Sequence, residues 1–317
     1  MRCLITGGRG FIGSYVTKIF EEAGHEVKIL SNLSHPASIS KGREIVYGDV
    51  RYEYDIERAA HDVDIIIHLA ARINVDRSRE SPRPFFDTNL LGTFNVLEVC
   101  RKLGKRLIYA ATSEALGSLK SGVDRMDESH PYAPINPYGA TKAAADMLCI
   151  GWQKSYGIPV ILLRSFNVTG IGQSLDFEGA FLPKTIHTVL QGHNPTIFGN
   201  GQQTRDYVWV EDLARAYLLL AEYGESGVYH VGSGVENSIE WIANEIIRIS
   251  GKDLKIEYKD PRPMEVRRLI CDYSKIAKIG WKPTKDISTI LKEMYEYARS
   301  EMLKPKCEWK DIYNCDK

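Results

Sequence analysis

A tyrosine and a lysine near the middle of the chain have the spacing needed for acid–base chemistry. In a helix, Tyr138 and Lys142 lie one turn apart, so both side chains can face one site. An ammonium lowers the pKa of a nearby phenol and makes the phenolate available as a base for a hydroxyl proton. The pattern also occurs on surface helices, but Pro137 suits a helix start and Ala143-Ala144-Ala145 suits close packing. We therefore expect a helix that carries a catalytic base.

Three glycines near the start of the chain could hold a phosphate group. Gly7, Gly10 and Gly13 follow the apolar run Cys3–Thr6 and precede Ser14–Ala23, whose apolar residues recur at helical spacing. Glycine permits a tight turn and the approach of bare backbone to a pyrophosphate, and a helix N-terminus adds amide donors. The spacing predicts a dinucleotide-binding turn that also includes Phe11 and Ile12.

Short apolar runs that recur between helix-length segments would position these residues. The expected strands are Cys3–Thr6, Glu26–Leu30, Ile65–Leu69, Arg106–Ala110 and Pro159–Arg164. This alternation is typical of an α/β fold, a Rossmann-like doubly wound parallel sheet with both faces covered.

The pattern becomes irregular after Arg164 and predicts a smaller, discontinuous C-terminal lobe that binds the substrate. We expect a strand at Tyr207–Val210, a helix at Leu213–Glu222, a strand at Val228–Val231 and a helix at Ile239–Ser250. The dinucleotide-binding domain would comprise residues 1–165 and 205–232, and the substrate lobe residues 166–204 and 233–302. The tail, residues 303–317, receives no assigned role.

The G-x-x-G-x-x-G turn and the Tyr-x-x-x-Lys pair together resemble the extended short-chain dehydrogenase/reductase family, which includes nucleotide-sugar epimerases and dehydratases. The resemblance implies a tightly bound NAD or NADP, recycled within each turnover, and a nucleotide-diphosphate sugar as substrate. It also assigns cofactor contacts to further positions, namely Asp49, Val50, Leu69, Ala70, Ala71 and Lys142.

One departure from the family concerns the choice of cofactor. The second strand normally ends in an acidic residue that binds the adenosine ribose, but here it ends in Ser31-Asn32. Without a carboxylate a 2′-phosphate is not repelled, and Arg9 in the glycine turn could pair with it. We therefore expect contacts from Ser31, Asn32 and Arg9, and tolerance of NADP.

The run Thr112-Ser113-Glu114 resembles the one found in family members that eliminate water or decarboxylate a 4-keto sugar. The resemblance makes Thr112 a hydrogen-bond partner of the substrate hydroxyl and of Tyr138. Once C4 of the sugar is a ketone, the C5 proton is acidic, and Glu114 with Ser113 could remove it and protonate the departing oxygen. Glu114 as a solvated loop residue remains the plain alternative.

Four residues resemble the family's contacts with the nucleotide diphosphate. Asn167 lies in a Phe-Asn-x-Thr-Gly segment most like that of the GDP-mannose dehydratase branch, and Arg205 lies where an arginine grips the diphosphate. Arg262 and Arg268 resemble the second set of contacts. Arginine suits this task because its fork engages two phosphate oxygens.

The resulting hypothesis is an NAD(P)-dependent nucleotide-sugar 4,6-dehydratase that oxidises C4 transiently. A nucleotide-sugar 4-epimerase is the first alternative, followed by a UDP-glucuronate-type decarboxylase and a 4-keto reductase. A cofactor-binding sensor without turnover is the alternative outside the enzymes.

The composition excludes several other classes. Lysine and arginine total 41, as do aspartate and glutamate, so no global field would attract nucleic acid or an anionic membrane. The six cysteines form no close pair, which indicates reduced thiols and no metal site. There is no apolar run of membrane-spanning length and no room for a signal peptide before the first strand. We expect a cytoplasmic protein. The family resemblance implies a homodimer that associates through the helices following the third crossover and the Tyr138 segment.

Overall fold

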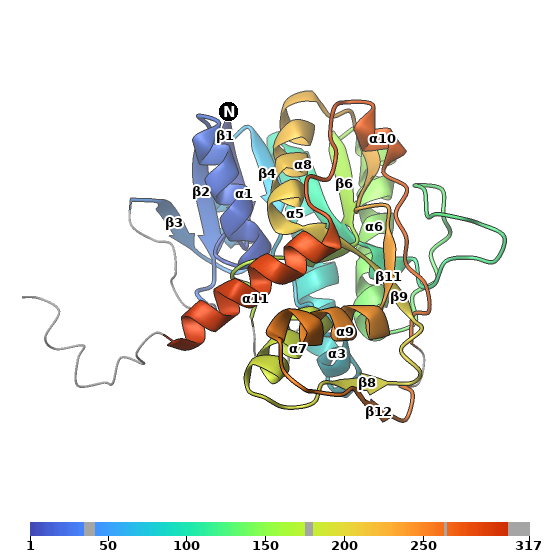
Figure 1. Cartoon of the computed structure of the whole chain (residues 1–317). Coiled ribbons are helices and arrows are strands. Elements are labelled where there is room, and N and C mark those ends of the chain that lie inside the picture. Colours follow the sequence, from blue (N-terminus) through green and yellow to red (C-terminus); the bar gives the residue numbers. More distant parts are fainter. Residues whose placement is uncertain (35–41, 175–179, 263–264, 304–317) are drawn as a thin grey trace, which may run out of the picture.

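The largest element of the structure, a computed structural model, is a seven-stranded sheet (Figure 1). The structure describes residues 1–34, 42–174, 180–262 and 265–303. The strand order is β10-β6-β5-β4-β1-β2-β3, and every neighbouring pair is parallel. The strands are β1 Arg2–Thr6, β2 Glu26–Ser31, β3 Glu44–Tyr47, β4 Ile65–His68, β5 Arg106–Thr112, β6 Val160–Ser165 and β10 Gly227–Val231. The order reverses between β1 and β4, where doubly wound sheets bind ligands at the carboxyl ends of their strands. The predicted Rossmann-like fold is confirmed.

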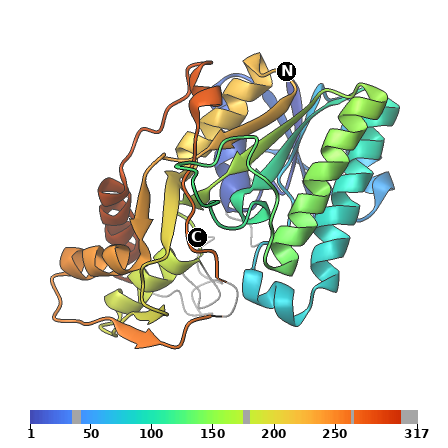
Figure 2. The ribbon, with the colours of Figure 1, turned by 90° about the vertical axis from the view of Figure 1, so that its right-hand side faces the viewer.

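Helices cover both faces of this sheet. On one face α1 (Phe11–Glu22) packs beside α8 (Val210–Tyr223). The other face carries α2 (Glu53–Ala60), α5 (Gly92–Leu103) and α6 (Pro137–Tyr156), of which α5 and α6 lie side by side in Figure 2. The chain reaches α5 through α3 (Val75–Glu80), α4 (Arg83–Phe85) and a π-helix, η1 (Phe86–Leu91). None of the described helices is long and apolar enough to cross a membrane.

Alternate residues of each central strand enter opposite cores, which explains why the strands are almost continuously apolar. Cys3 and Ile5 of β1 are buried under α1 and α8, whereas Leu4 is buried on the face of α2 and α5. Ile65 and Ile67 of β4 are likewise buried on the face of α1 and α8. Since both faces are covered, the pattern is a run of apolar residues rather than an alternation.

A smaller lobe follows β6, and it lies in the lower half of Figure 1. Its helices α7 (Phe181–Leu190), α9 (Ile239–Ser250) and α11 (Ile287–Leu303) enclose a separate core that includes Leu182, Ile242 and Leu291. Two small sheets, β11-β9-β7 and β12-β8, complete it. Their strands are β7 Asn167–Thr169, β8 Thr196–Phe198, β9 Thr204–Trp209, β11 Glu236–Ser238 and β12 Glu257–Lys259. The short helix α10 (Ser274–Ala277) lies apart from this lobe and packs against β10 of the large sheet.

The structure differs from the expected elements in several places, three of which involve the predicted dinucleotide-binding domain. β3 was not predicted, because it is a four-residue edge strand whose side chains are no more than half-buried. Helix α1 begins at Phe11, three residues before the expected start, with Gly10 as its N-cap. Strand β9 pairs with β7 and β11 and not with the large sheet, although the sequence placed residues 205–232 in the dinucleotide-binding domain.

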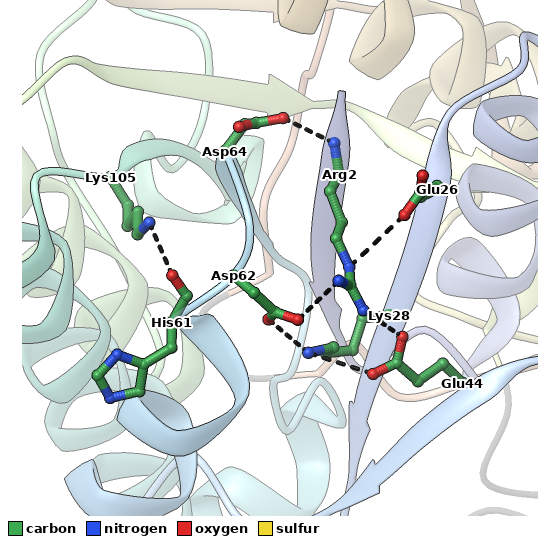
Figure 3. A network of polar contacts seen from close by, with 8 residues as sticks. All are labelled: Arg2, Glu26, Lys28, Glu44, His61, Asp62, Asp64 and Lys105. Atoms are coloured by element: carbon green, nitrogen blue, oxygen red, sulfur yellow. Dashed lines mark hydrogen bonds and ion pairs between the residues drawn. The ribbon is translucent and has the colours of Figure 1, made fainter.

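A network of ion pairs joins the amino-terminal ends of the first strands (Figure 3). The Arg2 guanidinium on β1 lies 2.7 Å from both Glu44 of β3 and Asp62. Lys28 of β2, whose side chain is 7% exposed, lies between the same two carboxylates at 3.2 and 2.5 Å. The network therefore links β1, β2 and β3 at the end of the sheet opposite to the glycine turn.

The cysteines that the structure describes, Cys3, Cys100, Cys149 and Cys271, are buried free thiols. Cys307 and Cys315, with the rest of the predicted tail, lie outside the described residues.

Candidate active site

The glycine turn between β1 and α1 leaves no room for side chains. Gly7 has φ of +71°, a conformation that favours glycine, and a Cβ there would lie 2.9 Å from the Ala70 nitrogen. A Cβ on Gly13 would lie 2.2 Å from the Gly7 carbonyl oxygen. Bare backbone and the amides of the first turn of α1, including Phe11 and Ile12, therefore face the carboxyl edge of the sheet, as a pyrophosphate site requires. Beside them, the Nε atom of Arg9 is buried without a hydrogen-bond partner.

The segment Leu69-Ala70-Ala71 after β4 is fixed against this turn by buried side chains. The Thr6 hydroxyl accepts a hydrogen bond from the Ala70 amide at 3.2 Å and lies 2.7 Å from Nδ1 of His68. The Thr93 hydroxyl donates to the Asn89 carbonyl, so it accepts from Nε2 of His68 at 3.2 Å. Burial, with the nearby charge of Lys142, lowers the pKa of His68 to about 3. His68 is thus a neutral core histidine that aligns the cofactor segment.

The ends of β2 and β3 form a polar group at the adenosine end of the predicted cofactor site. Asp49 accepts hydrogen bonds from Asn32 at 3.1 Å and from the Arg51 guanidinium at 2.8 Å. Burial opposes ionisation of Asp49, but these donors prevail and lower its pKa to about 2. Ser31 accepts from the Leu33 amide, and Val50 is buried against α5. Arg51 was not among the predicted residues, because its pairing with Asp49 depends on how the loop turns.

Tyr138 lies in the first turn of α6 beside the end of β5. Its side chain lies near that of Thr112, and its amide donates to Ser78 Oγ at 3.2 Å. Burial raises the pKa of Tyr138 well above its usual value; the neighbouring Thr112 hydroxyl opposes this rise, and the negative charge of Glu114 adds to it. The expected lowering of this pKa by Lys142 is therefore wrong for this structure.

Lys142 is 4% exposed and points to the sheet. Its ammonium donates to the Ala110 carbonyl at 2.6 Å and lies 4.2 Å from the centroid of the Tyr109 ring. Burial lowers the pKa of Lys142 to about 8, although the charge of Asp146 opposes the shift. The lysine is thus charged at neutral pH.

A buried charge network behind Lys142 escaped the sequence analysis. Asp146 is fully buried one turn further along α6, where it accepts from Arg164 at 2.7 Å and from the Tyr132 hydroxyl at 3.1 Å. Arg164 also donates to Nε2 of His230 at 2.8 Å, which leaves that histidine neutral. Arg164 and Asp146 lie on different elements, so no local spacing could reveal their pairing.

Ser113 and Glu114 occupy the short helix η2 (Ser113–Ala115) that follows β5. Ser113 is buried, and the Glu114 carboxylate accepts from Asn136 Nδ2 at 3.2 Å. The Glu114 amide donates to the Thr112 hydroxyl at 3.3 Å. Thr112, Glu114 and Tyr138 are therefore brought together at the carboxyl end of β5, as expected for groups that act on one substrate.

The four expected substrate contacts lie around the smaller lobe, and no described hydrogen bond or ion pair joins any two of them. Asn167 begins β7, and its Oδ1 atom is buried without a hydrogen-bond partner. Arg205 donates to the carbonyls of Thr204 and Val266, both at 2.8 Å. Each of the three arginines forms an ion pair with one carboxylate, namely Arg205 with Glu265, Arg268 with Glu236 and Arg262 with Asp76.

Comparison with known proteins supports this assignment of the fold. The sequence pattern of the NAD dependent epimerase/dehydratase family matches residues 3–232. The chain belongs to this family. The expected kinship and the expectation of an enzyme are confirmed, since the family comprises enzymes that use NAD.

Relatives within the family catalyse more than one reaction. A putative UDP-glucose 4-epimerase from Methanocaldococcus jannaschii is 33% identical over 302 residues, which are 94% of this chain and 98% of that protein. The UDP-glucose 4-epimerase of Thermotoga maritima superposes with a TM-score of 0.90 at 32% identity, covering 95% and 100% of the two chains. The dTDP-glucose 4,6-dehydratase DesIV of Streptomyces venezuelae, solved with NAD, gives a TM-score of 0.87 at 28% identity, covering 95% and 97%.

Proposed function

We propose that this family member is a nucleotide-sugar 4,6-dehydratase. The observation that carries the proposal is the position of Glu114. Its carboxylate is close enough to Tyr138 for its charge to act on the phenol, and Asn136 fixes it by a hydrogen bond. A reaction that only inverts C4 needs no base besides the tyrosine, whereas elimination of water needs a second one for the C5 proton.

The backbone of the glycine turn fits NAD or NADP, because a Cβ at Gly7 or Gly13 would fill the space next to it. The turn would hold the pyrophosphate, and Asp49 and Val50 would lie at the adenine. When bound, NAD(P)+ would supply the hydride-transfer chemistry that the reaction needs at C4 and C6 of the sugar. Lys142 would hold the nicotinamide ribose, and its charge would favour the phenolate of Tyr138 when the two side chains face each other.

The residues of the chain would carry the proton transfers. Tyr138, beside Thr112, would take the proton of the C4 hydroxyl. Glu114 would then take the C5 proton and deliver it to the departing C6 oxygen, so that water leaves and a C5–C6 double bond forms. When hydride returns to C6, C5 takes up a proton from solvent, and Tyr138 releases the proton that it took. Asn167 and Arg205, with Arg262 and Arg268, would bind the diphosphate, for which each arginine would exchange its present carboxylate for a phosphate.

Mass spectrometry with a panel of GDP-, UDP-, CDP- and dTDP-hexoses tests the proposal. We expect one of them to give a product that has lost one water, and Glu114→Gln to abolish this loss while reduction of the cofactor persists. A 4-epimerase is the second candidate, because two similar proteins carry that name. A product of unchanged mass with inverted C4 would establish the epimerase and reject the dehydratase.

The end of β2 supports tolerance of NADP. Ser31 and Asn32 bring no carboxylate to the adenosine ribose, and Arg9 has an unpartnered Nε atom. We expect NADP to bind within about tenfold of NAD, and Arg9→Ala to weaken NADP more than NAD by about tenfold, as for loss of a charge-assisted hydrogen bond. Titrations of both cofactors measure this ratio, and an unaltered ratio in the variant would reject the role of Arg9.

A further inference from the structure

Asn136 is the N-cap of α6 and lies directly before the catalytic tyrosine's turn. The residue is 7% exposed, and its Oδ1 atom accepts a hydrogen bond from the Gly139 amide at 2.7 Å. This bond satisfies one of the free amides in the first turn of the helix. The cap therefore ties the side chain of Asn136 to the backbone on which Tyr138 is carried.

Capping also fixes which atom of Asn136 faces Glu114. The oxygen and nitrogen of an asparagine amide are distinguished by their hydrogen-bond partners. A backbone N–H can only donate, so the atom that meets Gly139 must be the oxygen. The amide nitrogen consequently points the other way, to Glu114 Oε2 at 3.2 Å. A donor that faces a carboxylate is a favourable, charge-assisted pair.

The main chain of Glu114 is held independently of this contact. Its amide donates to the Thr112 hydroxyl, and its carbonyl oxygen packs on Gly139, where a Cβ would approach to 2.7 Å. The side chain is held differently. Within the part of the chain that the structure describes, Asn136 is the sole hydrogen-bond partner of the Glu114 carboxylate, and no cation is paired with it. The direction of the carboxylate thus depends on one amide.

We propose that Asn136 is a positioning residue that uses the cap of α6 to aim the Glu114 carboxylate at the sugar beside Tyr138. This inference rests on the proposed dehydratase function, in which Glu114 takes the C5 proton. It assigns two tasks to one side chain, since the oxygen sets the start of the helix that bears Tyr138 and the nitrogen sets the second base. The two groups that must act in succession are thereby kept in a fixed relation.

The substitution Asn136→Ser separates these tasks. Serine caps a helix about as well as asparagine, but its single short hydroxyl cannot reach Glu114 while it bonds to Gly139. In single turnovers of the full chain with its cofactor, we expect the rates of water loss and of C5 deuterium uptake from D2O to fall about tenfold to a hundredfold. C4 oxidation, followed by cofactor absorbance, and the melting temperature should stay near the wild-type values.

Two further variants sharpen the test. Asn136→Asp keeps a capping oxygen, but its second oxygen would face the Glu114 carboxylate in place of a donor and repel it. This variant should therefore eliminate water more slowly than Asn136→Ser. It also carries the test if the serine variant is too unstable to purify. Ser238→Ala removes a cap from α9, where Ser238 Oγ accepts from the Trp241 amide, and serves as the control for lost capping alone. It should lower the melting temperature without changing the ratio of water loss to C4 oxidation.

The outcomes separate this inference from the proposed function. If Glu114→Gln leaves water loss intact, the proposed function fails. If Glu114→Gln abolishes water loss while Asn136→Ser and Asn136→Asp eliminate at the wild-type rate, the positioning role alone fails. It also fails if Asn136→Ser slows C4 oxidation as much as water loss, because the residue would then serve only the fold of the site.

Discussion

The charge of Lys142 should depend on Asp146, and Asp146→Asn tests this dependence. Lys142 is buried beside the neutral groups Tyr109 and His68, and Cys149 lies on the same helix. Asp146, one helical turn away, is the anionic group that faces it. The substitution removes that charge and leaves the cation of Arg164 in place.

The size of the effect follows from burial and distance. The pKa of Lys142 falls from 10.5 to about 8, with burial as the main cause and Asp146 opposing it, and this fall corresponds to about 3 kcal/mol lost by the charged form. Side chains one turn apart are about 6 Å from each other. At an effective dielectric constant of about 20, unit charges at that separation attract by roughly 3 kcal/mol. Loss of Asp146 should therefore lower the pKa of Lys142 by a further one to two units, a range that allows for partial compensation.

The sign of the pH dependence is then fixed. Lys142 is charged below pH 8 and neutral above it, so activity that needs the ammonium falls as the pH rises through that value. In Asp146→Asn this alkaline limb should move toward neutral pH. Chemical shifts of protein labelled with 15N at lysine Nζ, assigned with Lys142→Met, measure the same midpoint without substrate or turnover.

The controls separate charge from hydrogen bonding and folding. Tyr132→Phe removes a hydrogen bond to the same carboxylate without a change of charge, so it should leave the midpoint of Lys142 in place. Breaking a buried ion pair costs about 3–5 kcal/mol, so Asp146→Asn is studied together with Asp146→Asn/Arg164→Met, which removes both charges. An unchanged midpoint in both folded variants would refute the electrostatic role of Asp146.

Three further predictions concern the cofactor turn, the sheet edge and the oligomer. Gly13→Ala places a Cβ against the Gly7 carbonyl and should weaken NAD binding about tenfold or more in fluorescence titrations. Gly151→Ala, whose Cβ would lie in open space, is the control and should bind NAD as the wild type does. Equal affinities of the two variants would contradict the steric account. Lys28→Met should lower the free energy of unfolding in urea by about 1 kcal/mol, because the half-exposed carboxylates of Asp62 and Glu44 lose one of their two cations and keep Arg2, and activity at the far edge of the sheet should persist. The proposed homodimer would form through the outer surface of α5 and α6, where the Met147 side chain is 47% exposed. Met147→Arg should then shift the protein to monomers in sedimentation velocity. An unaltered dimer would exclude this surface as the interface.

Local sequence patterns predicted the parts of the site that are built from neighbouring residues. The glycine turn joins a strand to the helix that follows it, and Tyr138 and Lys142 share one helix, so both were found from spacing alone. The edge strand β3 was not, because four half-exposed residues carry no clear period. The contact of Asn136 with Glu114 spans 22 residues of sequence, and that of Asp146 with Arg164 spans 18. Such contacts are set by how strands and helices pack, which no local spacing records.

The pKa of Tyr138 could not be predicted from the sequence either, for a different reason. The sequence shows that a cation lies one turn away, and from this a lowered pKa was expected. In the folded chain the Lys142 ammonium is bonded to Ala110, and burial dominates the titration of the phenol. The direction of a side chain and the extent of its burial decide the sign of a pKa shift, and both are properties of the tertiary structure.

The side chains around Tyr138, and not Tyr138 itself, decide which reaction follows C4 oxidation. Tyr138, Thr112 and Lys142 would perform the same C4 oxidation in an epimerase and in a dehydratase, and relatives of both kinds match this chain. After oxidation the two reactions differ in whether a base meets the acidic C5 proton before hydride returns. Glu114 is hydrogen-bonded by the residue that caps the tyrosine's helix, so its distance from the sugar is coupled to that of Tyr138. Under the proposed function, a carboxylate fixed in this way would favour elimination, whereas a freely solvated one would leave return of the hydride to C4 as the faster outcome.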